Sequence, residues 1–262
     1  MYSQEHLNYL KKIKRNNFTI RLLQVSILVL FIIIWQFLAD LKLINTFITS
    51  SPKLVLKTII ELHKQDLYVH IFTTIYETII SFSLGTIIGI LIASILWWNK
   101  TIRKVIDPYL TILNSLPKVA LGPIIIIWFG AGIKSIIIMS LLISTIITII
   151  NVTTSFNETE LDKILLMKSF KANNKQIFTK LVIPSSMNNI ISSLKINISM
   201  SLIGVIMGEF LCCKKGIGYL IMYGSQVFNL NLVITGIILL CIISAIMYYI
   251  VLFIEKKLVH KN

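Results

Sequence analysis

Four ionisable residues lie within or beside long apolar stretches of the sequence: Glu77, Lys118, Lys195 and Glu209. Ionisable groups inside a membrane span are costly, and they usually face a bundle interior or a water-filled cavity on a transport pathway. A structural ion pair, or a lysine that extends to the membrane surface, is the other ordinary explanation. We expect this structural role for Glu77 and Lys195, whereas the sequence leaves both roles open for Lys118 and Glu209.

Signatures of an enzyme are absent from the sequence. The histidines form no HExxH pair, no GxxxxGK[ST] phosphate loop occurs, and Gly224–Ser225 has no nearby base. Cys212 and Cys213 are adjacent and Cys241 lies in an apolar run, so we expect all three to be unpaired. The chain is therefore expected to be a non-enzyme, without a nucleotide site, metal or cofactor of its own.

The composition is that of a polytopic membrane protein. Of 262 residues, 56% are hydrophobic and 14% are charged, whereas charged residues reach about 25% in soluble domains. The first 21 residues are polar and basic. The apolar run after them lacks a small-residue cleavage site, so we expect a retained membrane anchor. The net charge of +14 is distributed in a way that argues against a nucleic-acid partner and for a lipid bilayer.

Apolar runs predict an all-α bundle with six membrane spans. The third run contains Pro108, Pro117 and Pro123, and a helix break at membrane depth needs cover from other protein or a water-filled cavity. Gly85 and Gly89 in the second run allow another helix to approach closely. The expected spans cover about Leu22–Leu38, Ile71–Trp98, Val105–Phe129, Ser135–Val152, Ile183–Phe210 and Leu232–Ile254.

The distribution of lysine and arginine predicts the topology. With a cytoplasmic N-terminus, the cytoplasmic segments hold 16 of these residues and the external segments hold 7. Positive charge favours the cytoplasmic side, so both termini are expected there. The expected organisation is a basic arm at 1–21, one transmembrane domain at 22–255 and a tail at 256–262. Ser51–Pro52 predicts the start of a short surface helix, and residues 211–231 a glycine-bearing re-entrant segment.

One long polar interruption, from Asn157 to Pro184, has the pattern of two short amphipathic helices. Asn157 with Glu160 predicts one helix start, and Asn173 with Gln176 predicts a second. The two helices are expected to join at about residues 171–174, and Pro184 to open the next apolar span. The first helix has apolar residues and one lysine at helical spacing, namely Leu161, Ile164, Leu165 and Lys168. On these features alone, the segment at 157–182 is either a docking surface or a solvated cytoplasmic loop.

Three motifs occur in order at separations that resemble one family. They are LPKVALGPIIIIWFGAGIKS (116–135), LLMKSFKANNKQIFTKLVIPSSMNNIISSLK (165–195) and GEFLCCKKGIGYLI (208–221). Over about residues 50–255, the chain resembles the transmembrane permease subunits of ABC importers, most closely the branch for nitrate, sulfonates, taurine and thiamine-pyrimidine precursors. The resemblance implies a type I importer permease fold in the plasma (inner) membrane.

The resemblance also implies partners and a mechanism. A permease homodimer would form the pathway, with separate ATPase subunits that bind ATP and magnesium below it and an extracytoplasmic substrate-binding protein above it. Transport would proceed by alternating access. The substrate would be a small anion such as a sulfonate, taurine or nitrate, or a thiamine pyrimidine precursor, with specificity set largely by the binding protein.

In that family, the cytoplasmic loop after the fourth span docks into a cleft of the ATPase subunit. The downstream part of the pattern is present here, whereas 165–167 read Leu-Leu-Met where Glu-Ala-Ala is expected. Lys171 replaces a glycine, and family members commonly carry an arginine at the position of Glu77. The matching positions are Ala172, Gln176, Phe178 and Pro184.

The resemblance assigns residues to two roles. Phe170 is the expected apolar anchor of the coupling loop. The residues expected to couple to the ATPase are Lys168, Ser169, Phe170, Lys171, Ala172, Asn173 and Asn174. The residues expected to line the translocation pathway are Lys118, Asn197, Ser201 and Glu209.

Two other classes of protein are weighed against this one. A secondary transporter that works without an ATPase suits a broken helix, but its usual mark is an internal repeat with matching breaks. The Pro117–Pro123 break has no equivalent in the fifth or sixth span. An intramembrane enzyme would need a nucleophile, metal ligands or paired acids at one depth, and none is visible in the sequence.

Overall fold

The computed structural model describes residues 4–259, and within that range the chain forms helices and turns without any strand. The long helices are α1 (Gln4–Asp40), α4 (Leu67–Trp98), α7 (Ile133–Asn157), α10 (Ile183–Cys212) and α12 (Leu230–Val259). The shorter helices are α2 (Thr46–Thr49), α3 (Pro52–His63), α5 (Lys100–Ser115), α6 (Gly122–Phe129), α8 (Leu161–Ser169), α9 (Asn174–Ile177) and α11 (Ile217–Gln226). A 3₁₀ turn, η1 (Lys118–Leu121), and a π-helical turn, η2 (Phe178–Val182), complete the order.

The predicted six-span, all-α architecture is confirmed. In the described range, 5 helices are long and apolar enough to cross a membrane, and the number is 6 when the bent pair, Lys100–Ser115 with Lys118–Phe129, is counted as one span. The basic arm predicted at 1–21 is continuous with α1 from Gln4 onward. Residues 1–3 of that arm and 260–262 of the predicted tail lie outside the described range.

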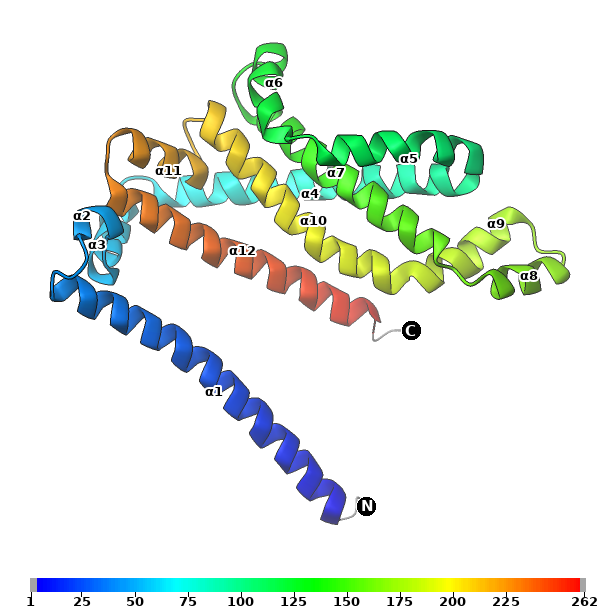
Figure 1. Cartoon of the computed structure of the whole chain (residues 1–262), viewed down its shortest axis with the longest axis horizontal. Coiled ribbons are helices and arrows are strands. Elements are labelled where there is room, and N and C mark those ends of the chain that lie inside the picture. The colour runs from blue at the N-terminus through cyan, green and yellow to red at the C-terminus, as the bar shows by residue number, and fades with distance from the viewer. Residues whose placement is uncertain (1–3, 260–262) are drawn as a thin grey trace.

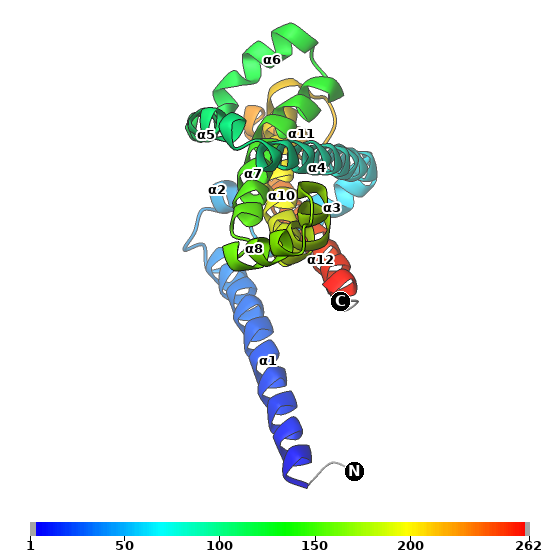
Figure 2. The same ribbon diagram turned by 90° about the vertical axis from the view of Figure 1, so that its right-hand side faces the viewer.

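Three helices, α4, α7 and α10, form the centre of the bundle, and α1 diverges from it (Figures 1 and 2). Small residues allow these three helices to approach one another closely, as was predicted from Gly85 and Gly89. A Cβ added at Gly85 would lie 2.6 Å from Ser144 Oγ on α7, and one at Gly204 would lie 2.4 Å from Ser140 Cα. The backbones of α10 and α7 therefore touch at a point that only glycine permits.

An aromatic cluster, defined by Trp97, Trp98, Phe156 and Phe178, joins these helices at the α8 end of the bundle. The ring of Phe178 in η2 lies 4.7 Å from that of Trp97 and 5.4 Å from that of Phe156, between ring centroids. Such tilted and edge-on geometries are favourable for aromatic pairs. The cluster ties the start of the long α9–η2–α10 helix to the ends of α4 and α7.

The proline-rich third span is broken at one point. α5 and the segment that starts at η1 meet at an angle of 85°. Leu116, which precedes Pro117, has the extended backbone that proline imposes on its neighbour. Pro108 lies inside α5 without ending it, and Pro123 lies in the first turn of α6, where no amide hydrogen is needed. The sequence therefore predicted the break but not which proline makes it.

Pro184 lies in the first turn of α10, at the predicted start of the fifth span, but no break in the helix precedes it. The helix runs without interruption from Asn174 to Cys212 through Pro184. A proline inside a helix removes one hydrogen bond and crowds the carbonyl group four residues before it. Here the π-helical turn at Phe178–Val182 immediately precedes the proline and widens the backbone at that place. The helix can therefore continue through the proline.

The contact between Gly204 and Ser140 yields a first test. Gly204→Ala places a methyl group against backbone, so we expect it to destabilise the protein by about 1–3 kcal/mol, as overpacking does. The measurement is the thermal unfolding midpoint of the purified protein in detergent. Gly122→Ala is the matched control, because its methyl group would meet the flexible ends of Leu211 and Met139. Equal midpoints for the two variants would contradict the close packing of α7 on α10.

Candidate functional sites

The polar segment between α7 and α10 projects from one end of the bundle (Figure 1). We call residues 158–177 the projecting segment; it contains α8 and α9. The predicted cap at Asn157 is wrong, because Asn157 is the last residue of α7 and its amide donates to the Thr153 carbonyl at 2.7 Å. The Asn157 side-chain oxygen also accepts a hydrogen bond from Arg103. The N-cap of α8 is instead Glu160, whose side chain does not bond to the helix start.

The turn between α8 and α9 is tight and well hydrogen-bonded. Asn173 and Gln176 form the predicted capping box, with both reciprocal bonds present at 2.8 and 2.9 Å. Lys171 has a φ of 56°, in the left-handed region, and its N–H donates to the Lys168 carbonyl at 2.8 Å. This conformation costs a non-glycine residue roughly 1–2 kcal/mol. The turn that a glycine would favour is therefore kept, although a lysine stands there.

The projecting segment leaves much of its apolar surface uncovered. Leu161 and Phe170 are each 76% exposed, and Leu165 and Leu166 are exposed as well. The predicted apolar face of α8 is thus not buried within this chain. The segment is joined to the aromatic cluster and its neighbours by the buried side chain of Ile177 and by the half-buried side chains Ile164, Met167 and Ala172.

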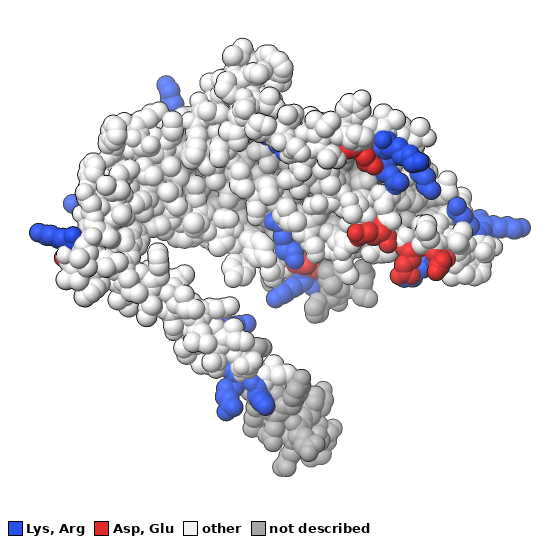
Figure 3. Space-filling model, viewed as in Figure 1, with Lys and Arg blue, Asp and Glu red and all other residues white. Residues whose placement is uncertain are grey.

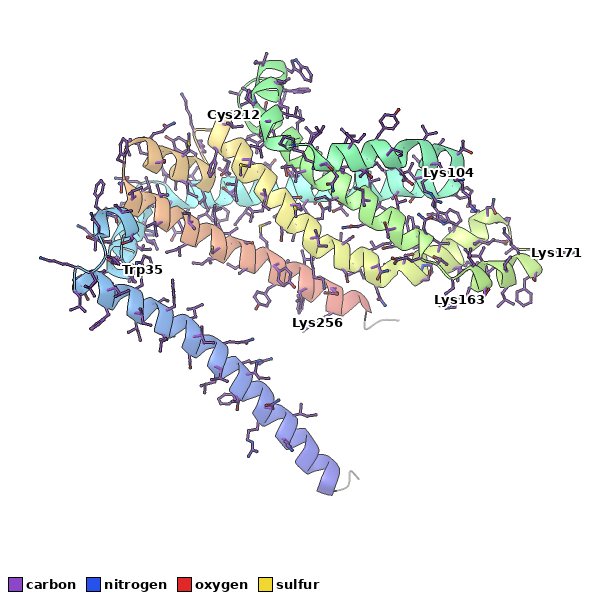
Figure 4. The ribbon with its side chains drawn as sticks, viewed as in Figure 1. Trp35, Lys104, Lys163, Lys171, Cys212 and Lys256 are labelled. Carbon is purple, nitrogen blue, oxygen red and sulfur yellow. The ribbon has the colours of Figure 1, made fainter. Side chains whose placement is uncertain are left out.

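A cavity of about 630 Å³ opens between the projecting segment and the ends of α4 and α5. Its walls include Trp97 and Trp98 on one side and Leu165 and Lys168 of α8 on the other. Charged side chains are densest on this end of the molecule and along the lower part of α1 (Figure 3). A smaller group lies where Lys195 meets Glu255 of α12, and isolated basic side chains occur at the opposite end. The labelled residues Lys104, Lys163 and Lys171 all lie toward this end, away from Trp35 and Cys212 (Figure 4).

A second polar site is buried at the opposite end, where α4, α10 and α11 meet. Glu209 is 1% exposed. Its carboxylate oxygens accept hydrogen bonds from the Thr74 hydroxyl and from the Gly218 N–H, both at 2.6 Å. Thr74 Oγ1 also accepts from the Ile217 N–H at 2.9 Å. We call this arrangement the Glu209 junction; it fixes the first turn of α11 against the other two helices.

The Glu209 junction depends on residues that the sequence analysis did not single out. Gly216 has a φ of 104°, and a Cβ there would lie 2.2 Å from the Glu209 carboxyl carbon. The Gly216 N–H contacts His70 Nδ1 at 3.1 Å, and the His70 ring stacks on Tyr219 at 5.9 Å. A usable signal existed, because His70, Thr74 and Glu77 follow one another at helical spacing on one face of α4.

The four residues predicted to line a pathway do not form one cluster. Asn197 and Ser201 are 1% and 0% exposed, within the contacts of α10 with α4 and α7. The Asn197 amide donates to Thr86 Oγ1 at 2.6 Å, and the Ser201 carbonyl accepts from the Ser140 hydroxyl at 2.8 Å. Within a single copy of the chain these side chains, like Glu209, face protein. Their role in a pathway stays a prediction.

Two lysines in or near spans have local partners. Lys118 Nζ donates to the Asn114 carbonyl at 2.8 Å, across the break between α5 and η1. Lys195 forms an ion pair with Glu255 at 3.0 Å, which confirms the structural role expected for it. Glu77 is different, since it is fully buried and makes no ion pair among the described residues.

Covalent and metal chemistry have no visible basis in the described range. No group of three or more metal-ligating side chains occurs there. Cys212, Cys213 and Cys241 are free, as predicted. Burial is the main cause that raises the pKa of the Cys213 thiol, so the thiol stays protonated and poorly reactive. What the two sites offer is an exposed apolar surface and a buried polar junction.

Comparisons with known proteins place the chain among transport proteins. Residues 85–260 match the family described as binding-protein-dependent transport system inner membrane component. An ABC transporter permease protein from Haemophilus influenzae is 28% identical over 231 residues, or 88% of this chain and 94% of the relative. An aliphatic sulfonates transport permease protein from Bacillus subtilis is 27% identical over 233 residues, or 87% of this chain and 83% of the relative.

The fold has a counterpart among solved structures. The inward-facing MetNI methionine ABC transporter contains a chain that matches with a TM-score of 0.65 at 18% identity. The match covers 77% of this chain and 98% of that one. This likeness concerns the arrangement of the helices and carries no information on substrate.

Thr74 offers a test of the Glu209 junction. Thr74→Val removes the hydroxyl group, so the Glu209 carboxylate loses a donor and the buried Ile217 N–H loses its acceptor. We expect a loss of about 2–4 kcal/mol in stability, because each buried polar group left unpaired costs about 1–3 kcal/mol. The measurement is the thermal unfolding midpoint in detergent. Thr74→Ser, which keeps the hydroxyl group, should behave like the unaltered protein, and an equal loss in both variants would contradict the role of these hydrogen bonds.

Proposed function

The chain belongs to the family of inner membrane components of binding-protein-dependent transport systems, the permease subunits of ABC importers, and from this premise we propose how it couples to its ATPase. The projecting segment would dock on a separate ATPase subunit and transmit that subunit's movements to the spans. The coupling contacts would come from the turn and its flanks: Lys168, Ser169, Phe170, Lys171, Ala172, Asn173 and Asn174. ATP and magnesium would be bound by the partner and not by this chain.

The observation that carries the proposal is the exposed apolar surface of a segment whose turn is well hydrogen-bonded. Phe170 and Leu166 lie next to a hydrogen-bonded turn, and exposed apolar groups rimmed by polar ones mark interaction sites. Lys168 and Lys171 supply positive charge beside them. A partner surface with an apolar pocket and acidic rim would fit this arrangement.

The aromatic cluster supplies a route from the docking surface to the spans. A displacement of the projecting segment acts on η2, where Phe178 contacts both Trp97 and Phe156. Because packed interiors transmit strain, the movement would reach α4 and α7 together. When ATP closes the ATPase dimer, two such segments in a permease homodimer would be drawn together and the pathway would open outward.

The distribution of charge supports an orientation for this arrangement. Lys and Arg side chains are dense on the projecting segment, near Lys104 and along the lower part of α1 (Figures 3 and 4). Positive residues favour the cytoplasmic side. Both termini and the projecting segment would therefore be cytoplasmic, and the Glu209 junction would lie at the external side, toward a substrate-binding protein.

The substrate class rests on the relatives of the chain. They include permeases named for aliphatic sulfonates, taurine, nitrate and formylaminopyrimidine. We therefore propose a small anion of the sulfonate, taurine or nitrate type, with a thiamine pyrimidine precursor as the second candidate. Uptake of each labelled compound by cells with and without the intact permease distinguishes the two.

The alternative, a secondary transporter without an ATPase, predicts a different complex. Purification in mild detergent from the native membrane should bring down an ATPase subunit in stoichiometric amount if the chain couples to ATP hydrolysis. A lone bundle that is active in uptake without nucleotide would favour the secondary transporter.

The coupling contacts yield a direct prediction. Phe170→Ala with Lys171→Glu removes an apolar anchor and reverses a charge at the turn, so uptake should fall by about tenfold or more while the protein stays in the membrane. The measurement compares substrate uptake with ATP hydrolysis in reconstituted vesicles, where hydrolysis should persist. The control is Phe253→Ala with Lys256→Glu, an exposed pair on α12. Uptake that is unchanged in the first variant would contradict the docking role.

Lys118 separates a pathway role from a structural one. Lys118→Ala should lower uptake several-fold and leave assembly intact if the ammonium group faces the substrate pathway. The hydrogen bond from Lys118 to the Asn114 carbonyl suggests the competing outcome, in which its loss destabilises the bend between α5 and η1. Size-exclusion chromatography of the complex, together with uptake, distinguishes the two, with Lys134→Ala as the control. A complex that fails to form would assign Lys118 to structure.

A further inference from the structure

Glu77 presents a problem that the Glu209 junction does not solve. Its side chain is 0% exposed, and neither carboxyl oxygen has a hydrogen-bond partner of standard geometry. It lies on α4 one turn after Thr74 and faces the Glu209 carboxyl, which is itself 1% exposed. An unpartnered carboxylate in such a place would be strongly unfavourable, because it loses its hydration and gains no hydrogen bond or counter-charge.

The surroundings provide no positive charge to stabilise two carboxylates. Neither Glu77 nor Glu209 forms an ion pair within the described part of the chain. The other ionisable groups near the junction are His70 on α4, Cys213, Lys214 and Lys215 before α11, and Tyr219 on α11. Both lysines lie in the segment that connects α10 to α11 and form no ion pair with either carboxyl group among the described residues. Two buried like charges in contact strongly oppose each other's ionisation.

The two carboxyl groups are not equivalent. Glu209 accepts hydrogen bonds from the Thr74 hydroxyl and the Gly218 N–H, and it lies at the N-terminus of α11, where the helix dipole favours negative charge. Glu77 has none of these donors. Ionised Glu209 beside protonated Glu77 is therefore the favoured combination. A protonated Glu77 could donate to a remaining lone pair of Glu209, since each carboxylate oxygen can accept two bonds.

We propose that Glu77 and Glu209 form a proton-binding site that holds one proton between them. This proton keeps α11 packed against α4 and α10. Loss of the proton would leave two adjacent buried negative charges, and their repulsion would draw Glu209 away from Gly218. The first turn of α11 would then lose the contacts that fix it. The site would make the stability of this end of the bundle depend on pH.

The sign of the pH dependence follows from proton linkage. The folded protein holds a proton that the exposed glutamates of the unfolded chain have already released near neutral pH. Stability therefore falls as the pH rises, and the unfolding equilibrium constant increases by up to about tenfold for each pH unit. Thermal unfolding of the purified full-length protein in detergent, between about pH 6 and about pH 9, measures this slope.

Glu77→Gln is the variant that tests the site, because it is neutral at every pH and can donate to Glu209. We expect it to flatten the pH dependence and to be more stable than the unaltered protein at the alkaline end. Glu61→Gln, an exposed substitution on α3, is the matched control and should retain the original slope. A Glu77→Gln protein that is destabilised with its slope unchanged would overturn the proposal.

Infrared spectroscopy of the unaltered protein tests the proposal without any variant. A protonated carboxyl group has a C=O stretching band that an ionised one lacks. We expect such a band at neutral pH, its disappearance at alkaline pH and its absence from the Glu77→Gln protein. If the unaltered protein shows no such band, the proposal fails, even if Glu77→Gln does not fold.

Discussion

The close approach of α4, α7 and α10 is the constraint on which the rest of the structure depends. Helices in lipid gain little from burying apolar groups against each other, so packing and hydrogen bonds between small residues hold them together. Gly204 lies against the Ser140 backbone, and the Ser140 hydroxyl bonds to α10 at the same place. The same tight contact seals Asn197 and Ser201 away from lipid, where their polar groups would be costly.

Features that depend on neighbouring residues could be predicted from the sequence. Span number follows from apolar length, and the Asn173–Gln176 cap follows from two side chains and the backbone beside them. Where two local signals compete, the sequence did not predict correctly where a helix begins or ends. Asn157 could start one helix or end another, and its bond to the Thr153 carbonyl favours the end. Pro184 could end a helix, but a preceding π-helical turn accommodates it.

The projecting segment and the Glu209 junction also differ in how far they could be predicted from neighbouring residues in the sequence. The projecting segment was predictable because a run of polar residues interrupts an apolar chain, although its uncovered leucines became evident only in three dimensions. The Glu209 junction joins Thr74 to a residue 135 positions away. No local pattern specifies that contact, and the buried pairing of Glu77 with Glu209 depends entirely on the register in which α4 packs against α10. Glu77 was expected to have a structural role, of which an ion pair is one form, and it makes no ion pair within the described range.

The uninterrupted helix from Asn174 to Cys212 has a mechanical meaning. Its 39 residues correspond to about 58 Å at the usual rise per residue. One end carries the capping box of the projecting segment, and Glu209 lies in the last turn at the other. A rotation imposed at the first end would therefore be transmitted along a stiff helix to the second end. The π-helical turn would be the part of this helix that deforms most easily. The projecting segment and the Glu209 junction therefore lie at opposite ends of one continuous helix.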